Sequence, residues 1–369
     1  MMIRLKSIDN FRGIAVIAMI WLHLSEWSLS GDSSSFLKIP LFVTQYGFLV
    51  SYQFISGVSR FLFYKTGGTI EKSSETINNR RIKRIFLVRG IFLLVVALLY
   101  NSVVAISTSR PSEIWSWFVL LAIAFSLLMI TPLLDTSKKT RGFLGVAFLF
   151  LNFTLLWLLQ DYKGQPNLFG FLYHLLFYPV GLHPILSSFA VFLIGTVVGD
   201  IIHEIYYKEV NKSRLSILKK KLIMPSILIG GIIVTFIAIV NSFLFINLPS
   251  FYGIVSTIGV CLLLFSLFIF IEEYEIFKPK KNYKFIFYFS YYSLTIYLVH
   301  NLLYFLFNKS LNVLASSIYI VLVIVSIGLI LKLLYPKVGA SLSIKKLISK
   351  LSNRVVVKIE KTRVSNSLE

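Results

Sequence analysis

The sequence is poor in cysteine, glycine and charged residues. Its 369 residues include one Cys, 20 Gly and 10 Pro, and only 14% are charged. A single cysteine excludes a disulfide scaffold, and the low glycine content excludes a collagen-like chain. Cys261 lies in an apolar run without a partner cysteine, which indicates a core residue without redox or metal chemistry.

Hydrophobic residues are in large excess. They make up 56% of the chain, and the mean hydropathy is +0.79. Soluble domains are about half apolar and about a quarter charged. Here the apolar residues recur in blocks of about twenty that are apolar all round, whereas strands of a β-barrel alternate. The sequence therefore predicts an all-α, polytopic membrane protein.

Ten apolar segments are long enough to cross a bilayer about 30 Å thick. They cover residues 11–29, 40–64, 85–107, 114–134, 142–159, 184–203, 222–245, 251–271, 285–307 and 312–335. A further apolar segment, 167–181, is interrupted by glycine and proline. We expect it to form a re-entrant or interfacial helix on an outer loop.

Most basic residues fall on one side of the predicted membrane: 29 of the 37 Lys and Arg lie in inner segments and four lie within the spans. With the N-terminus in the cytoplasm, the outer loops contain only Lys38, Arg110, Lys163 and Lys309 of the 37 Lys and Arg. The positive-inside rule then predicts about ten spans, an even number, with both termini cytoplasmic. This bias accounts for the net charge of +21. We expect no nucleic-acid partner, because no basic helix or finger motif stands outside the apolar blocks.

The chain divides into a transmembrane domain, residues 1–335, and a basic cytoplasmic tail, residues 336–369. Apolar residues recur at helical spacing from Leu342 to Leu351, so the tail is either an amphipathic helix on the inner leaflet or a solvated charged segment. No internal repeat is visible, which weakens the case for an inverted-repeat transporter.

Ionisable side chains inside a membrane are costly and usually mark function. In the first span, Arg12 and His23 are eleven residues apart, about three helical turns, so they lie on one face roughly 16 Å apart. Glu26 follows one turn after His23. An imidazole beside a carboxylate suits a general base. The alternative is a polar stripe that holds helices together.

The ninth span offers a second intramembrane histidine. Ser293, Tyr297 and His300 share one helical face, and His300 is expected at a depth similar to that of His23. The two histidines could therefore belong to one site. A hydrogen bond from His300 to a neighbouring helix is the alternative.

Arginines gather at the cytoplasmic ends of the first three spans, at Arg12, Arg60, Arg81, Arg84 and Arg89. Topology alone does not require the three that lie inside apolar runs, namely Arg12, Arg60 and Arg89. Arginine holds phosphate through two parallel hydrogen bonds. The cluster therefore indicates a polyanionic ligand from the cytoplasm, such as coenzyme A. An ATPase is disfavoured because no Gly-rich phosphate loop is present, and we expect no metal.

These residues also resemble known motifs. Residues 8–23 resemble the opening of the transmembrane acyltransferase superfamily. Two pairs, Arg12 with His23 and Arg81 with Arg84, resemble the signature motifs of the acyltransferase-3 family. The segments 54–57 and 293–300 are similar to that family's second and late spans. Stretches 19–23, 57–59 and 184–199 lean towards a sister group that includes the catalytic domain of heparan-α-glucosaminide N-acetyltransferase.

The resemblance covers residues 1–335 and implies acyl transfer across the membrane, with acetyl-CoA bound from the cytoplasm and a sugar acceptor outside. It carries His23 over as a catalytic residue. The sister group's animal enzyme is thought to use a histidine in the loop after the first span. Residues 24–38 contain no histidine, so the sequence does not support an acyl-histidine on that loop. Direct transfer and an acyl-histidine intermediate elsewhere both stay open.

We therefore expect a multi-pass acyltransferase of the cell membrane, either an O- or an N-acetyltransferase. It would move an acetyl or longer acyl group from cytoplasmic acyl-CoA to a sugar, glycan or lipid-linked glycan outside. The arginine cluster would bind the phosphates of the donor. His23 would accept a proton, with Glu26 orienting its ring. His300 or Tyr297 would place the acceptor or the thioester carbonyl. The oligomeric state, including a homo-oligomer, is open.

Two rival functions use the same residues. A proton-coupled transporter or flippase-like carrier would use the buried His and Glu as a proton relay, but would not need the arginines if its solute were neutral. A structural or regulatory membrane protein would use the buried charges only to hold helices together.

Overall fold

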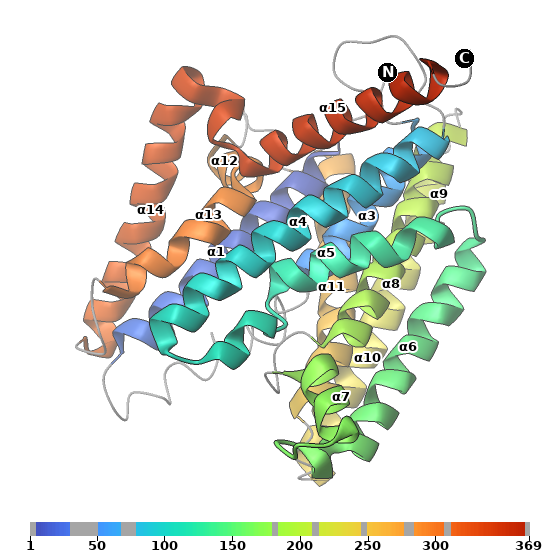
Figure 1. Cartoon of the computed structure of the whole chain (residues 1–369). Helices are drawn as coiled ribbons and strands as arrows, with labels where there is room; N and C mark the ends of the chain where they lie inside the picture. Colours follow the sequence, from blue (N-terminus) through green and yellow to red (C-terminus); the bar gives the residue numbers. More distant parts are fainter. Residues whose placement is uncertain are drawn as a thin grey trace.

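The computed structural model is all-helical (Figure 1). It describes residues 5–29, 51–67, 79–178, 184–208, 214–244, 249–276, 284–305 and 311–365. Within these ranges there is no β-strand, and one isolated bridge joins Leu29 to Leu311. The prediction of an all-α polytopic membrane protein is confirmed.

Helices occupy every segment in which a span was predicted. The α-helices are α1 (Lys6–Ser28), α3 (Ser51–Lys65), α4 (Asn79–Thr108), α5 (Val119–Ile130), α6 (Lys138–Leu159), α7 (Leu168–Phe177), α8 (Ile185–His203), α9 (Arg214–Leu218), α10 (Met224–Leu244), α11 (Pro249–Glu273), α12 (Lys284–Tyr291), α13 (Ser293–Val299), α14 (Val313–Val338) and α15 (Ile344–Ser365). Short 3₁₀ or π turns are η1 (Pro111–Trp115), η2 (Thr131–Leu133), η3 (Gln160–Tyr162), η4 (Glu204–Lys208), η5 (Lys219–Ile223), η6 (His300–Phe305) and η7 (Gly339–Leu342). Parts of the predicted segments lie outside the described residues, namely 40–50, 179–181, 245 and 306–307.

Seven of the described helical stretches are long and apolar enough to cross a membrane by themselves. The predicted spans that are not among them correspond to α1, α3 and the pair α12 and α13. Polar side chains lower the hydropathy of α1, whereas α3, α12 and α13 are short. The total of ten spans and the cytoplasmic placement of both termini stay predictions. The weakly apolar spans carry most of the predicted site residues.

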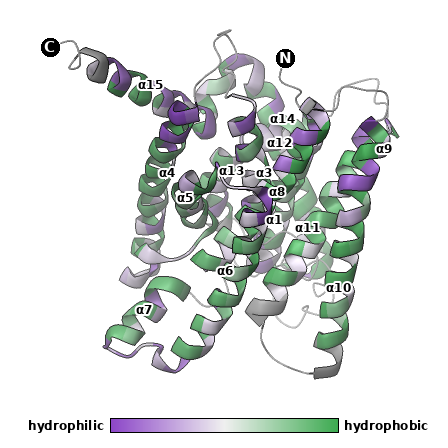
Figure 2. Ribbon diagram, turned by 90° about the vertical axis from the view of Figure 1, so that its right-hand side faces the viewer, coloured by the Kyte–Doolittle hydropathy of each residue, from purple (hydrophilic) through white to green (hydrophobic). Residues whose placement is uncertain are grey.

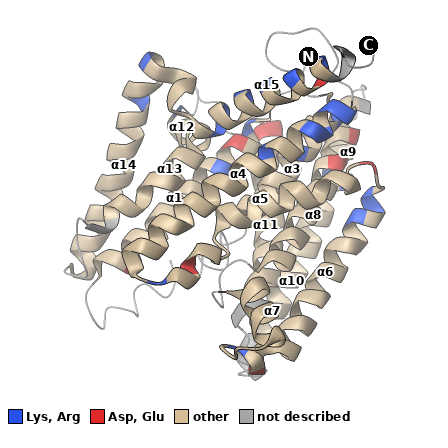
Figure 3. Ribbon diagram, viewed as in Figure 1, with Lys and Arg blue, Asp and Glu red and all other residues tan. Residues whose placement is uncertain are grey.

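Charge and hydropathy are segregated along the bundle. Most Lys, Arg, Asp and Glu gather at the end where α4 and α6 begin and where α15 lies (Figure 3). We call this the basic end. The helix middles are hydrophobic (Figure 2), and large apolar side chains such as Leu99, Phe150 and Leu333 are more than 60% exposed. Such a surface suits contact with lipid, where apolar side chains need no cover.

Glycine permits the closest helix contact beside the site. A Cβ atom at Gly57 of α3 would collide with the Phe192 carbonyl of α8, and one at Gly195 of α8 would collide with the Phe54 carbonyl of α3. Small residues in membrane helices let backbones approach in this way. The contact holds α3 against α8 and so fixes where α3 presents its polar face.

The first helix is anchored at both ends. The backbone N–H groups of Lys6 and Ser7 donate to the two carboxylate oxygens of Glu272 in α11, over 2.8 and 2.6 Å. These groups have no partner inside the helix, so a carboxylate from another helix acts as the N-terminal cap. At the other end, the hydroxyls of Ser28 and Ser316 lie 2.5 Å apart. The stripe of polar residues on α1 is thereby held in register with α11 and α14.

The ninth predicted span is not one continuous helix. It is broken at Tyr292, between α12 and α13. A break frees backbone carbonyls. Those of Tyr291 and Ser290 accept hydrogen bonds from the side chains of Ser343 and Lys345, over 3.0 and 2.8 Å. Both donors come from the segment beyond residue 335, so the broken helix is completed by the C-terminal part of the chain.

The segment after residue 335 is helical and packs on the protein. Helix α14 continues to Val338, and α15 then runs along α4 across the basic end (Figure 1). Ile348, Ser352 and Val356, spaced four residues apart, are buried on one face of α15. The structure therefore shows α15 as a helix with the buried part of its apolar face packed against protein. Its placement on the inner leaflet stays a prediction.

Candidate active site

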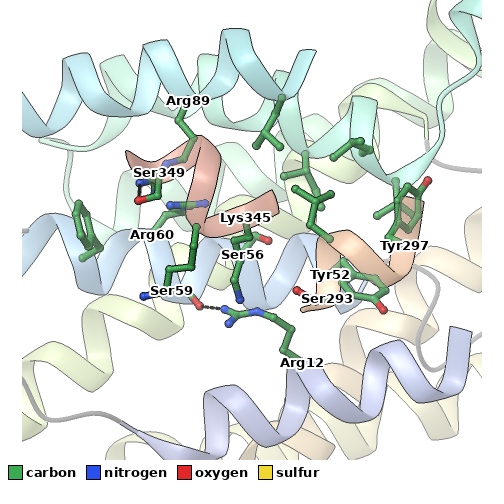
Figure 4. Close-up of a pocket in the computed structure, with 17 residues that line it drawn as sticks. Arg12, Tyr52, Ser56, Ser59, Arg60, Arg89, Ser293, Tyr297, Lys345 and Ser349 are labelled. Carbon is green, nitrogen blue, oxygen red and sulfur yellow. Dashed lines mark hydrogen bonds between the residues drawn. The ribbon is translucent and has the colours of Figure 1, made fainter. Parts of the chain in front are cut away.

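One cavity of about 340 Å³ opens among α1, α3, α4, α5, α13 and α15. Its volume lies within the range of about 300–1,000 Å³ that is typical of small-molecule sites. Three predicted arginines, Arg12, Arg60 and Arg89, line it, and so does Tyr297 (Figure 4). The cavity therefore brings together residues from both parts of the predicted site.

The cationic end of the cavity is formed by guanidinium groups from three helices. Arg12 donates to the Ser59 hydroxyl over 2.7 Å (Figure 4). It also lies 3.6 Å from the Asp9 carboxylate. Arg60 lies over the Phe86 ring, 5.9 Å from its centroid. Three cations around one space, with one neighbouring carboxylate from α1, favour an anionic ligand.

Arg89 has hydrogen-bonding capacity left over. Its side chain is buried, and it donates from Nη2 to the Ser349 hydroxyl of α15 over 2.5 Å. Its Nε atom is buried without a hydrogen-bond partner among the described residues. A buried polar group without a partner is costly. A ligand oxygen in the cavity would satisfy it, so the arginine fits an anionic group such as phosphate.

Arg81 and Arg84 lie elsewhere. Neither is among the residues that line the cavity, although the sequence grouped them with the other three arginines. Arg81 Nε lies 3.4 Å from one oxygen of Glu360, and Arg84 Nη1 lies 3.2 Å from the other. Glu360 belongs to α15, so this pair of arginines holds the C-terminal helix. Their direct contact with a donor phosphate stays a prediction.

The structure adds cavity residues that the sequence reasoning missed. Lys345, Lys346 and Ser349 of α15 line the cavity beside Arg60 and Arg89. Their positions depend on the contact between α15 and the helix break at Tyr292. The sequence does show two adjacent lysines at the start of an amphipathic pattern. It does not show against which part of the protein that helix packs.

The two histidines of the first and ninth predicted spans lie together beyond the other end of the cavity. The ring centroids of His23 and His300 are 5.1 Å apart, and that of Tyr297 is 5.5 Å from His300. His300 is buried, and its Nδ1 lies 2.5 Å from the Tyr297 carbonyl oxygen. A carbonyl can only accept, so Nδ1 carries the proton and Nε2 of neutral His300 is an acceptor.

His23 has a carboxylate partner on its own helix. Its Nδ1 lies 3.4 Å from Glu26 Oε2, as the spacing predicted. This contact favours the proton on Nδ1 and leaves Nε2 as the basic nitrogen. Trp27 stacks on His23 at 5.3 Å and reaches His300 at 6.0 Å. Sequence reasoning missed Trp27, although its position one turn after His23 could have indicated a stack.

The acyltransferase-3 family model, described as an acyltransferase domain, matches residues 5–335. The chain belongs to this family. The acyltransferase is thus a multi-pass membrane protein whose matched region contains both histidines and all five predicted arginines. Helix α15 lies beyond the matched region. In a comparison with curated protein sequences, none matched this acyltransferase. Its closer likeness to heparan-α-glucosaminide N-acetyltransferase stays a prediction.

Proposed function

We propose that this membrane acyltransferase takes its acyl group from acyl-CoA on the cytoplasmic side and transfers it to a sugar or glycan on the outer side. The observation that supports the proposal is the cavity among α1, α3, α4, α5, α13 and α15, which is lined by arginines at one end and by Tyr297 at the other. Beyond Tyr297 lie His300 and His23. The arginines could therefore bind the anionic part of a long donor, while its reactive part would lie near Tyr297 and the adjacent histidines.

The phosphates of the donor would bind Arg12, Arg60 and Arg89 at the basic end. The pantetheine arm would follow the apolar wall formed by Leu93, Leu120 and Ile123. This placement brings the thioester towards Tyr297, whose hydroxyl could donate to the carbonyl oxygen as negative charge develops there. The three-turn separation of Arg12 and His23 on α1, roughly 16 Å, suits an extended arm.

His23 would act as the general base. Its Nε2 takes the proton of an acceptor hydroxyl while the oxygen attacks the thioester carbonyl carbon. An amino acceptor would attack as the neutral amine, after loss of the ammonium proton to solvent, and Nε2 would take the further proton that the attacking nitrogen loses. The carbon–sulfur bond then breaks, and the thiolate leaves with the electron pair. Glu26 fixes the ring orientation of His23 and stabilises the imidazolium that forms. His300 would position the acyl acceptor by accepting a hydrogen bond from it at Nε2.

A thermal-shift experiment tests the donor assignment. Purified protein in detergent should gain stability with coenzyme A or acetyl-CoA, about 2.7 kcal/mol at a ligand concentration a hundredfold above Kd. Pantetheine, which lacks the phosphates, should give a much smaller shift at the same concentration. No change in Tm at millimolar coenzyme A would contradict the acyl-CoA assignment.

Labelling of single added cysteines tests the sidedness. Ser107 and Lys139 are both exposed and lie at opposite ends of the bundle. In intact cells, a Ser107→Cys variant should react with an impermeant thiol reagent. A Lys139→Cys variant should react only after permeabilisation. Native Cys261 is buried and serves as the unreactive background. The opposite pattern would place the basic end outside.

A transfer assay tests the whole proposal. Reconstituted protein should move a labelled acetyl group from acetyl-CoA to saccharide or lipid-linked saccharide acceptors. In a direct mechanism, coenzyme A is released only when acceptor is present. A burst of coenzyme A without acceptor would instead indicate an acyl-enzyme intermediate.

A further inference from the structure

Helix α15 closes one side of the donor cavity, although it lies beyond the part of the chain matched by the family. It is held at three places along its length. Its beginning meets the break between α12 and α13, where Ser343 and Lys345 donate to freed carbonyls. Further along, Ser349 accepts from Arg89, and near its end Glu360 meets Arg81 and Arg84.

The charge distribution of α15 is unusual for such a position. The helix is rich in Lys and Arg, and Glu360 is the single carboxylate in residues 344–365. That carboxylate contacts two arginines of α4. At the other end, Lys345 and Lys346 lie in the first helical turn, where the helix dipole disfavours cations. Both lysines line the cavity that Arg60 and Arg89 also line.

Several like charges around one small space repel one another unless an anion lies among them. The cavity is lined by Arg12, Arg60 and Arg89 together with the two lysines of α15. The Nε atom of Arg89, buried and without a described partner, is an independent sign of a missing acceptor. The same cavity thus combines excess positive charge with an unused buried donor.

We propose that α15 is part of the donor-binding site, with Lys345 and Lys346 as ligands of the donor's phosphate groups. An ammonium has three N–H donors, so Lys345 can keep its hydrogen bond to the Ser290 carbonyl and also donate to a phosphate oxygen. Glu360 holds the helix on α4 through its ion pairs with Arg81 and Arg84. The substrate class that this arrangement selects is a phosphorylated acyl thioester rather than a simple thioester. The inference rests on the proposed function, because it assigns further residues to the same site.

Kinetics of the full-length, reconstituted protein test this inference. The double variant Lys345→Ala/Lys346→Ala should raise KM for acetyl-CoA about ten- to hundredfold, with kcat nearly retained. S-acetylpantetheine, which has no phosphates, should be used equally well by the variant and the wild type. The matched control is Lys350→Ala/Lys358→Ala, which removes two exposed charges from the same helix. It should keep KM within about twofold of the wild type.

The outcomes separate this inference from the proposed function. If the wild type uses acetyl-CoA and both double variants keep the wild-type KM for acetyl-CoA, α15 is not part of the donor site. The acyltransferase assignment then stands. If the wild type does not use acyl-CoA at all, the proposed function itself fails.

Alkylation gives a second measurement that does not depend on the lysine variants. In a Ser349→Cys variant, coenzyme A should slow the reaction of the introduced thiol at least several-fold. In a Lys350→Cys variant, whose side chain is exposed, coenzyme A should have no effect. Equal rates with and without coenzyme A at position 349, in protein that retains acetyl-CoA activity, would overturn the inference.

Discussion

The two ends of the cavity hold their functional groups by different physical means. At the cationic end, long arginine and lysine side chains extend from α1, α3, α4 and α15. Beyond the other end, two imidazole rings lie 5.1 Å apart, with contacts to Glu26 and to the Tyr297 carbonyl. Charges act over distance, whereas proton transfer requires close geometry. The two ends should therefore respond differently to substitution.

The largest effect is expected at the histidine end. Removing a general base typically lowers the rate about a hundred- to ten-thousand-fold. His23→Ala should therefore nearly abolish acyl transfer, measured with labelled acetyl-CoA. Stabilisation of the same variant by coenzyme A should persist, because Arg12 lies roughly three helical turns from His23 on α1 and neither histidine lines the cavity.

His300→Ala is the matched variant for this experiment. It should lower turnover or the affinity for the acyl acceptor, and the loss of activity should be smaller than that of His23→Ala. An active His23→Ala variant together with an inactive His300→Ala variant would exchange the two roles. Activity in both variants would leave the histidines as packing groups and refute the mechanism.

A smaller effect is expected at the cationic end. Arg60→Gln removes a cation from the cavity and should raise KM for acetyl-CoA roughly ten- to hundredfold, because hydrogen bonds to charged groups contribute about 1.5–3 kcal/mol. The value of kcat should change little, since Arg60 does not touch the reacting atoms. Exposed Lys139, changed to Gln, provides the control. A fall in kcat with unchanged KM would remove the distinction between the two ends.

The role of Arg81 and Arg84 can be sharpened by changing their partner. If they support α15, Glu360→Gln and Arg81→Ala/Arg84→Ala should raise KM for acetyl-CoA alike, by up to about tenfold, because each pair is partly exposed. If the arginines bind phosphate directly, Glu360→Gln should leave KM unchanged or lower it. Measuring both variants under the same conditions decides between these roles.

The smallest effect is expected for Glu26→Gln. The side chains of His23 and Glu26 are 35% and 48% exposed, so their pairing is screened by solvent. Loss of such a pair costs at most about 1 kcal/mol, or roughly a fivefold lower kcat. KM for acetyl-CoA should not change. A loss as large as that of His23→Ala would mean that the carboxylate itself takes the proton.

Local features of the sequence were sufficient for much of this protein. Apolar runs predicted helices in the right places because a membrane-spanning backbone must satisfy its own hydrogen bonds. Helical periodicity placed Arg12, His23 and Glu26 on one stripe of α1, and Glu26 lies beside His23 as expected. These properties depend on residues close together in the chain.

Tertiary structure decided which distant groups meet. Only packing brings His300 against His23, and only the break at Tyr292 gives Ser343 and Lys345 carbonyls to bind. Glu360 meets Arg84 across 276 residues. Such contacts arise from the apolar faces that helices bury against one another, and residue spacing along a single helix carries no information about its neighbour. For this reason sequence reasoning placed all five arginines in one cluster. In the fold, three of them line the cavity, whereas Arg81 and Arg84 contact Glu360 of α15.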